Sequence, residues 1–566
     1  MSTHKTRRGV SLLAAVAIAA GGFALPVAAF ADNTPDADPS GDGVAAVQIN
    51  ALVNLDKDAR GTLTIEKHDR TDANGTTAGN GLADPGVTGN LLDGVKYKIE
   101  RLTTVDLTTQ AGWEKLAGYA GNVATAKADG TDAAIERTTG DDSTGVAKFT
   151  NLPLGAYVVT EVSAPSGYTL SDPFIVTVPM THPTNLNEWN YDPIVYPKNA
   201  KVEIDKTVDD EDAYTVGDDI DYTLKSDIPN LPGTQTLDYY AIIDEYDSRM
   251  TLKGNSVVLT LDDSTALVAG QDYTLAEITN AFDQDGDGVG TVMVKRATAE
   301  FTESGRAKIL KARRDGTSQK VTMKLTTTIT SPIAGDGVVP NIAIVLPNKP
   351  SNNWDPKTNP TPPPDTPPTD KVESKYGKVK ITKEDSTTST KKLADAEFQV
   401  YRCTTQEDTA INLNGQNFVT GDYKLVGDPL TAFAVAADGT ASQTEVNTFK
   451  TAADGTITID ALKNNDWTNG KVDDTPDAYC LVETKAPAGY ELQPRPIAFQ
   501  ILESNSTSDN KYTLMTTVKD VPSNGGFKLP LTGAAGVGVL LTAGALLVGG
   551  SAAIAYANKR RKDQEA

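Results

Sequence analysis

Residues 61–67 read Gly-Thr-Leu-Thr-Ile-Glu-Lys, and residues 377–383 read Gly-Lys-Val-Lys-Ile-Thr-Lys, with the lysine at the same distance from the glycine. Residues 156–168 read Ala-Tyr-Val-Val-Thr-Glu-Val-Ser-Ala-Pro-Ser-Gly-Tyr, and residues 478–490 read Ala-Tyr-Cys-Leu-Val-Glu-Thr-Lys-Ala-Pro-Ala-Gly-Tyr. Alternating apolar and polar residues of this kind are typical of half-buried β-strands. Both pairs of segments occur in the same order, so the first and last parts of the chain are predicted to be copies of one fold.

The chain has 566 residues, which is too long for a single hydrophobic core. Short strand-like segments between turn residues favour an all-β fold of three tandem immunoglobulin-like sandwiches. The middle sandwich begins with a third lysine-bearing segment, Ala-Lys-Val-Glu-Ile-Asp-Lys at residues 200–206. A proline-rich stretch ahead of Lys371 predicts a stiff linker or an ordered inter-domain strap. The predicted parts are a first domain at 32–199, a middle domain at 200–349, a linker at 350–371 and a last domain at 372–528.

The N-terminus has the pattern of a secretory signal peptide. Basic residues Lys5, Arg7 and Arg8 precede an apolar run, and the small-x-small triplet Ala-Phe-Ala follows at residues 29–31. The apolar run is too short to cross about 30 Å of hydrocarbon, which argues against a membrane helix. We therefore expect residues 1–31 to be removed during export.

The C-terminal region, residues 529–566, contains three parts in a fixed order. The pentapeptide Leu529-Pro530-Leu531-Thr532-Gly533 precedes an uncharged stretch that ends at residue 557, and a Lys-Arg-Arg-Lys run follows. The uncharged stretch is long enough to be a transmembrane span, and the basic run would stay on its cytoplasmic side. The combination resembles the cell-wall sorting signal of sortase substrates. It implies a secreted protein that is anchored to the peptidoglycan of a Gram-positive bacterium.

The composition excludes several classes of function. The chain has 75 acidic and 52 basic residues, a net charge of −23, so we exclude a nucleic-acid partner. The two cysteines, Cys403 and Cys480, are predicted to form one disulfide in an exported chain. Three histidines and the lack of a Cys/His cluster argue against a zinc or redox cofactor and against a hydrolase, so no enzyme activity on other molecules is expected.

Buried charged groups are the strongest chemical signal in the sequence. Strand alternation puts Glu161 on the same face as Val159, and Glu483 on the same face as Leu481. Lys67, Lys206 and Lys383 each stand two residues after an isoleucine, so they are also predicted to face a core. A buried charge is costly, so these acids and amines should be neutral or tightly partnered.

These segments resemble the CnaB-type and CnaA-type domains of Gram-positive adhesins, in which a lysine and an asparagine condense into an intramolecular isopeptide bond. The Glu-x-x-Ala-Pro-x-Gly-Tyr segments resemble the E-box of sortase-assembled pilins. The resemblance implies that Glu161, Glu483 and, in the middle domain, Asp244 are the acids that promote the bond. Burial favours the neutral, nucleophilic amine, and the nearby acid transfers protons.

The asparagine partners are expected near the end of each domain. The resemblance implies the pairs Lys206–Asn348 and Lys383–Asn524, with Asp520 as the alternative partner of Lys383. In the first domain the expected pair is Lys67–Asn199, although related shaft pilins often lack this bond. The alternative for all three lysines is an ordinary salt bridge at a strand end.

Residues 189–199, Trp-Asn-Tyr-Asp-Pro-Ile-Val-Tyr-Pro-Lys-Asn, resemble the pilin motif of shaft subunits. The resemblance implies that Lys198 is the amine that attacks a sortase acyl-enzyme. A pilus-type sortase would cut after Thr532 of one subunit and pass its carbonyl to Lys198 of the next. Identical subunits would thereby form a head-to-tail polymer, and a housekeeping sortase would join its base to the wall.

Asp283, Asp285 and Asp287 carry carboxylates at every second position, as a calcium loop begins. The twelfth position is Val294 in place of the glutamate that completes an EF-hand. Structural Ca²⁺ and an acidic solvated turn therefore stay open as alternatives, and no other cofactor is expected.

The sequence thus predicts the shaft subunit of a covalent surface pilus, or fimbria, that supports adhesion. The alternatives are a monomeric wall-anchored adhesin that binds host matrix or glycan, and an accessory subunit at the pilus base. The host receptor is not readable from the sequence.

Overall fold

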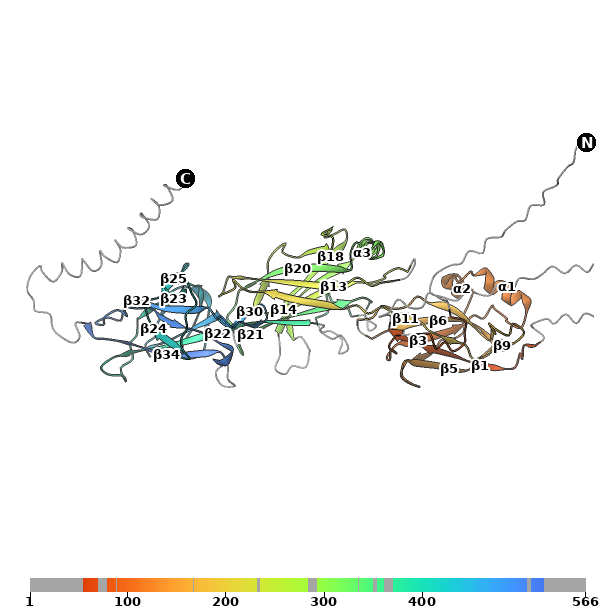
Figure 1. Cartoon of the computed structure of the whole chain (residues 1–566), viewed down its shortest axis with the longest axis horizontal. Coiled ribbons are helices and arrows are strands. Elements are labelled where there is room, and N and C mark those ends of the chain that lie inside the picture. The colour runs from red at the N-terminus through yellow and green to blue at the C-terminus, as the bar shows by residue number, and fades with distance from the viewer. Residues whose placement is uncertain are drawn as a thin grey trace, which may run out of the picture. The chain divides into compact units, whose positions relative to one another are not determined.

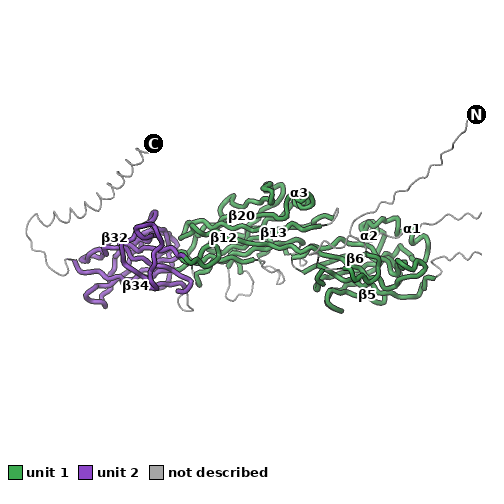
Figure 2. Tube along the Cα trace, in the orientation of Figure 1, with its two compact units in different colours: residues 1–377, 461–474 green, residues 378–460, 475–566 purple. Residues whose placement is uncertain are grey.

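The computed structural model describes residues 54–69, 79–87, 89–165, 167–231, 235–283, 293–333, 335–349, 354–360, 370–505 and 511–523. These residues belong to two compact units (Figure 2). Unit 1 contains the chain up to Gly377 together with Ala461–Asp474. Unit 2 contains Lys378–Asp460 and the chain from Thr475 onwards.

The N-terminal domain of unit 1 is a β-sandwich. One sheet has the order β10-β1-β5, with bounds Ile194–Val195, Arg60–Glu66 and Val146–Pro153. The other has the order β4-β3-β6-β7, with bounds Ile135–Thr138, Lys96–Arg101, Gly155–Ser163 and Phe174–Val178. Two short pairs complete it: β2 (His68–Asp69) with β11 (Lys198–Asn199), and β8 (Met180–Thr181) with β9 (Trp189–Asn190). Alternate residues of β1 and β3, such as Leu63, Ile65 and Tyr97, fill the core between the sheets.

Two helices cover the outer face of the second sheet in this domain (Figure 1). They are α1 (Gln110–Gly118) and α2 (Val123–Ala128). Leu116 of α1 and Ala126 of α2 pack in one cluster with Ala156 and Val158 of β6. Strand β6 is therefore covered on both faces, which explains why its apolar run is nearly continuous.

The middle domain of unit 1 is a second sandwich. Its first sheet has the order β12-β13-β20-β16-β17, with β15 also paired to β20; the bounds are Ile204–Asp209, Asp219–Asp227, Lys320–Ile329, Val258–Leu261, Ala266–Leu267 and Met250–Leu252. Its second sheet contains β18, β19, β14, β21 and the first half of β22; the bounds are Tyr273–Asp283, Met293–Phe301, Ala241–Asp247, Val338–Leu346 and Asp370–Asp385. Helix α3 (Glu303–Asp315) is capped by the Thr302 hydroxyl and ends at Gly316, whose φ of 73° favours glycine.

Every residue of β14 is buried, because both faces of this strand are covered. Asp244 faces the interior, where it meets Lys206. Glu245 faces the other side and pairs across the sheet with Arg296. Consecutive carboxylates on one strand therefore lie in two separate buried sites.

Part of the predicted proline-rich linker is an ordered strap on the middle domain. Trp354 packs on the outer face of β14 and β21, with Ile243 and Ile344. The fully buried Arg296 guanidinium binds Glu245 and donates to the carbonyls of Pro356, Asn359 and Pro360 at 3.3, 2.9 and 2.7 Å. It also lies 4.7 Å and 4.9 Å from the rings of Phe282 and Trp354. One buried cation thus organises residues 354–360.

A segment from the predicted last domain belongs to unit 1. Residues Ala461–Asp474 include the end of β29 (Thr456–Lys463) and the hairpin of β30 (Trp467–Thr468) and β31 (Lys471–Val472). Lys463 lies 3.2 Å from the Asp210 carboxylate, and Asn469 exchanges hydrogen bonds with Asp210. This segment was predicted to lie within the last domain, 372–528, because pairing between distant segments leaves no local signal in the sequence.

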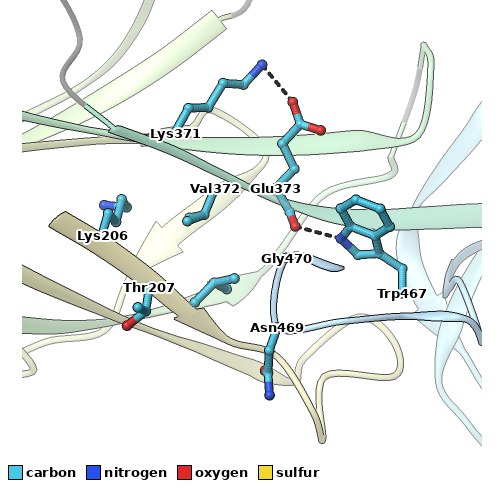
Figure 3. Close-up of a pocket in the computed structure, with 9 residues that line it drawn as sticks. Lys206, Thr207, Lys371, Val372, Glu373, Trp467, Asn469 and Gly470 are labelled. Carbon is cyan, nitrogen blue, oxygen red and sulfur yellow. Dashed lines mark hydrogen bonds and ion pairs between the residues drawn. The ribbon is translucent and has the colours of Figure 1, made fainter. Parts of the chain in front are cut away.

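The hairpin borders a shallow hollow (Figure 3). Lys206, Thr207, Trp467 and Asn469 are among its lining residues. The Trp467 indole donates to the Glu373 carbonyl at 2.8 Å, and Lys371 pairs with the Glu373 carboxylate at 2.7 Å. The Lys206 side chain is fully buried, so the hollow gives no access to its amine.

Unit 2 is built on the second half of β22. This half pairs in parallel with β34 (Thr513–Asp520), while β29 pairs with β26 (Ala432–Val435) and β26 with β27 (Ala441–Val446). The facing sheet has the order β24-β33-β32-β23-β25, with β28 on β23; the bounds are Phe418–Thr420, Ile497–Phe499, Ala478–Lys485, Glu397–Thr404, Lys424–Val426 and Phe449–Lys450. A short 3-10 helix, η2, covers Glu503–Asn505. The predicted Cys403–Cys480 disulfide is confirmed, and it links the neighbouring strands β23 and β32.

The mostly-β sandwich prediction is confirmed. The predicted signal peptide (1–31) and sorting signal (529–566) lie outside the described residues, as do Asp285 and Asp287. Asp283 ends β18, and the described residues include no cluster of three metal-binding side chains. Among the same residues, no helix is long and apolar enough to cross a membrane.

We expect Arg296→Met to lower the free energy of unfolding of the middle domain by about 3–5 kcal/mol, because Glu245 would stay buried without its counter-charge. Lys357→Ala is the matched control on the same strap. Its ion pair with Glu300 is partly exposed, so the expected loss is about 0–1 kcal/mol. Urea denaturation monitored by hydrogen exchange of β14 amides measures both. If the two variants were equally stable, the proposed role of Arg296 in holding the strap and Glu245 would be contradicted.

Candidate functional site

Among the residues that the structure describes, three lysines have fully buried side chains that lie against a carboxylate. Lys67, Lys206 and Lys383 have side-chain exposures of 0%, and so do their acidic partners Glu161, Asp244 and Glu483. The sequence predicted all six residues and all three pairs. Each lysine lies two residues after a buried isoleucine of a β-strand, and its side chain faces the interior.

In the N-terminal domain, Lys67 and Glu161 are joined by a third residue. The Lys67 amine lies 3.0 Å from Glu161 Oε2 and donates to Asn199 Oδ1 at 2.5 Å. The Asn199 amide in turn donates to Glu161 Oε1. The structure therefore brings together the predicted trio of amine, amide and acid in a closed ring of hydrogen bonds.

In unit 2, the residue beside Lys383 and Glu483 is an aspartate. The Lys383 amine lies 2.7 Å from Glu483 and also bonds to the Asp520 carboxylate. Burial raises the pKa of Glu483, while bonds from Lys383 and from the Gln493 backbone N–H oppose this rise. Asn524, the partner favoured by sequence analysis, lies outside the described residues.

Strand register shows that Asp520 occupies the position that Asn199 has in the first domain. Asn199 is the parallel neighbour of Asp69, two residues after the lysine, and Asp520 is likewise the neighbour of Asp385. The residue after each partner accepts a hydrogen bond from the residue after the E-box tyrosine, at 2.9 Å in both domains (Thr169 N to Ala200 O, Glu491 N to Val521 O). The internal repeat therefore extends to the partner position, with aspartate replacing asparagine.

In the middle domain, burial acts on both members of the pair. It lowers the pKa of Lys206 and raises the pKa of Asp244, while their mutual attraction opposes both shifts. The two side chains are in direct contact. Loss of solvent thus favours a neutral amine beside a protonated carboxyl group.

The Asn341 side-chain amide interacts with Asp244 of this pair, whereas the predicted partner Asn348 makes its contacts elsewhere. Asn341 is fully buried on β21, its proximity lowers the pKa of Asp244, and yet its amide atoms have no well-formed hydrogen bond. Asn348 instead accepts from the Leu170 N–H at 3.0 Å and donates to the Tyr168 carbonyl. The Lys206–Asn348 pairing is therefore corrected, because the Asn348 amide is used at another place.

The sequence also carries a signal for Asn341, which lies inside a strand and not at the end of the domain, where the partner was expected. Residues 338–346 read Val-Val-Pro-Asn-Ile-Ala-Ile-Val-Leu, with Asn341 as the one side-chain amide in an apolar run. Strand alternation from Ala343, the register partner of Asp244, places Asn341 on the same face as that acid.

An aromatic ring lies beside each buried lysine. The distances from amine to ring centroid are 5.8 Å for Lys67 and Tyr97, 5.1 Å for Lys206 and Tyr222, and 5.4 Å for Lys383 and Phe398. Tyr97 and Phe398 are the register partners of Glu161 and Glu483. These rings exclude water from the amine and were not predicted from the sequence.

Lys198, the predicted intersubunit lysine, lies next to Asn199 on β11. Strand alternation turns Asn199 into the buried ring with Lys67 and turns Lys198 to the opposite side, where it is half-buried. Its predicted partner Thr532 lies outside the described residues.

Comparison with known proteins identifies three regions of the chain. Residues 53–200 match the N-terminal domain of Gram-positive pilin subunit D1, residues 377–515 match a prealbumin-like fold domain, and residues 521–565 match the LPXTG cell wall anchor motif.

Relatives match nearly the whole chain. It is 38% identical to the fimbrial subunit type 1 of Actinomyces viscosus, with 99% of each chain covered. It is 30% identical to the fimbrial subunit type 2 of Actinomyces naeslundii, with 90% of this chain and 92% of the relative covered. The full-length major pilin SpaD of Corynebacterium diphtheriae is 28% identical, with a TM-score of 0.54 and coverage of 84% and 100%. The chain therefore belongs to the Gram-positive fimbrial subunits, the family of wall-anchored structural pilins that carry an LPXTG motif.

Proposed function

We propose that this subunit forms the shaft of a covalent fimbria and is stabilised by three internal amide bonds. The observation that carries the proposal is the occurrence, three times in one chain, of a fully buried lysine in contact with a buried acid and near a second carboxyl or amide group. Such groups are costly to bury unless they react or neutralise one another. The bonds are Lys67–Asn199, Lys206–Asn341 and Lys383–Asp520.

In the first two sites the lysine attacks a side-chain amide. The neutral Nζ of Lys67 or Lys206 adds to Cγ of Asn199 or Asn341, a new C–N bond forms, and the original C–N bond breaks. Glu161 or Asp244 donates a proton to the leaving nitrogen and takes one from the attacking amine. The products are an amide and ammonia.

In unit 2 the leaving group is water. Lys383 Nζ adds to Cγ of the Asp520 carboxyl group, a C–N bond forms, and the bond from Cγ to one carboxyl oxygen breaks. Glu483 donates a proton to the departing oxygen and takes the one that the amine loses, so that water leaves. Glu483 lies against the Lys383 amine and has the raised pKa that suits a proton donor. Asp520 is supported over Asn524 because its position repeats that of Asn199.

Polymerisation would use the two sites at which the chain meets sortase. A pilus-type sortase breaks the Thr532–Gly533 peptide bond and holds Thr532 as a thioester, which the Lys198 amine of the next subunit converts to an amide. A housekeeping sortase would transfer the last Thr532 to peptidoglycan. The LPXTG match and the fimbrial relatives support this assignment.

We expect the chain from residue 32 to residue 532 to be lighter than its sequence mass by about 52 Da, from two ammonia molecules of about 17 Da and one water of about 18 Da. Intact mass spectrometry after reduction of the disulfide measures this deficit. Lys383→Ala should restore about 18 Da, and Asn341→Ala should abolish the loss of ammonia at the middle site. A wild-type chain at full sequence mass would refute the proposal.

Lys198→Ala should remove the high-mass ladder of polymers from denaturing gels of cell-wall extracts, because no amine remains at this joint. Single subunits should still reach the wall through Thr532. Lys201→Ala, which removes an exposed lysine nearby, is the control and should leave the ladder intact. A ladder that persists in Lys198→Ala would rule out this lysine.

Lys206→Met should make the stability of the middle domain depend on pH. The variant removes the charge that lowers the pKa of Asp244, so burial keeps this pKa above its unfolded value of about 3.9. The folded state then holds more protons than the unfolded state, and stability falls as pH rises above about 4, by at most about 1.4 kcal/mol per pH unit. Hydrogen exchange of β14 amides between pH 4 and 7 measures the slope. The double variant Lys206→Met/Asp244→Asn should show none, and an equal slope in both variants would contradict the assignment.

A further inference from the structure

Two buried aspartates have no role in the amide chemistry described above, although they lie beside it. Asp69 and Asp385 each stand two residues after a reactive lysine, and each is the strand neighbour of the amide partner. Their exposures are 6% and 4%. Each accepts a hydrogen bond from the tyrosine that ends the E-box, Tyr168 at 3.1 Å and Tyr490 at 2.7 Å. The same contact therefore occurs independently in two domains.

Glu161 and Glu483 lack a strand neighbour on one side in their own sheets. Strand β7 pairs with β6 only up to Val159, and β33 pairs with β32 only up to Leu481. Glu161 and Glu483 stand two residues beyond these last pairs. Asp244 of the middle domain, in contrast, is paired on both sides, with Ala297 and Ala343.

The chain after the E-box supplies the missing neighbour. Three residues after Tyr168, the Ser171 N–H donates to Glu161 Oε2 at 3.1 Å. Three residues after Tyr490, the Gln493 N–H donates to Glu483 Oε2 at 2.8 Å. The short segment from tyrosine to donor thus has one end on the lysine strand and the other on the catalytic acid.

We propose that Tyr168 and Tyr490 are positioning residues for amide formation: each binds the aspartate on the lysine strand and thereby holds the backbone donor on the E-box glutamate. This inference rests on the proposed function and adds two residues to it. The middle domain is consistent with it, since Val208 stands two residues after Lys206 and the acid there has strand neighbours on both sides.

The charges around the pair in unit 2 support the contact. Hydrogen bonds from Thr387 and Tyr490 hold the pKa of Asp385 below its usual value, so its carboxylate is ionised and is a strong acceptor. Lys391 lies 5.2 Å from the Tyr490 ring and near Asp385. The groups that face Glu483 itself are Lys383 of β22, Asp520 of β34 and the Gln493 N–H.

The test follows bond formation over time in the chain from residue 32 to residue 532. The chain is collected in denaturant before it folds, refolded by dilution and sampled by mass spectrometry, with cross-linked peptides assigning the loss of water to Lys383–Asp520. Tyr490→Phe keeps the ring and removes the hydroxyl. Tyr401→Phe is the matched control, because its hydroxyl bonds to Gln399 in the same domain and away from the site.

We expect Tyr490→Phe to slow bond formation about ten- to a hundredfold, as small displacements of catalytic groups do. The limb of the pH–rate profile that reports deprotonation of Glu483 should move to higher pH, because a bond that lowers its pKa is weakened. Asp385→Asn combined with Tyr490→Phe should be no slower than the slower single variant, since both break one contact.

A Tyr490→Phe chain that reacts as fast as Tyr401→Phe would overturn the inference. A slower reaction with an unshifted pH profile would also overturn it, since that result indicates a general loss of structure. A wild-type chain that never loses water at this site would instead refute the proposed function. Tyr168→Phe with ammonia release from Lys67–Asn199 provides the same test in the first domain.

Discussion

A lysine amine enclosed with a carboxyl group, away from water, is the interaction on which the rest of this molecule depends. Burial makes the charged forms of both groups expensive, and in the middle domain it shifts the pKa values of Lys206 and Asp244 toward neutrality. This arrangement is enclosed by the surrounding sheets and by the aromatic ring beside each lysine. A further strand carries the amide or acid side chain next to the pair. A neutral amine close to an amide or acid can attack it as a nucleophile. Burial, which disfavours the charged amine, therefore makes the lysine reactive.

Two other buried ion pairs show what this arrangement requires. Arg296 and Glu245 are equally buried, but a guanidinium cannot lose its proton in a protein, and the strap carbonyls satisfy it. Lys463 lies beside Asp210, whose carboxylate also accepts from Ser374 and from the Asn469 N–H. These donors satisfy the Asp210 side chain. In the three proposed sites, a further amide or acid side chain, Asn199, Asn341 or Asp520, lies beside the buried pair.

The internal repeat explains which residues could be predicted from the sequence. Lys67, Glu161, Lys383 and Glu483 are embedded in segments that occur twice, and strand alternation then fixes the faces on which they lie. Asn341 was missed because its signal is one polar residue within an apolar strand. The Arg296 strap and the transfer of residues 461–474 to unit 1 arise from contacts between distant segments, for which the local pattern carries no information.

The proposed amide bonds would also determine which parts of the chain carry tension. In the proposed polymer, force that enters at Lys198 would pass to Asn199 and on to Lys206, so the N-terminal domain would not lie on the path that carries the force. The proposed Lys206–Asn341 bond would bypass most of the middle domain, and the proposed Lys383–Asp520 bond would bypass most of the last. The segment from Asn341 to Lys383 is the longest one that no amide bridges, and it contains the strap bound by Arg296. This segment is held by noncovalent contacts. They are the antiparallel pairing of β21 with β22 and the contacts of the buried Arg296 with Glu245 and the strap.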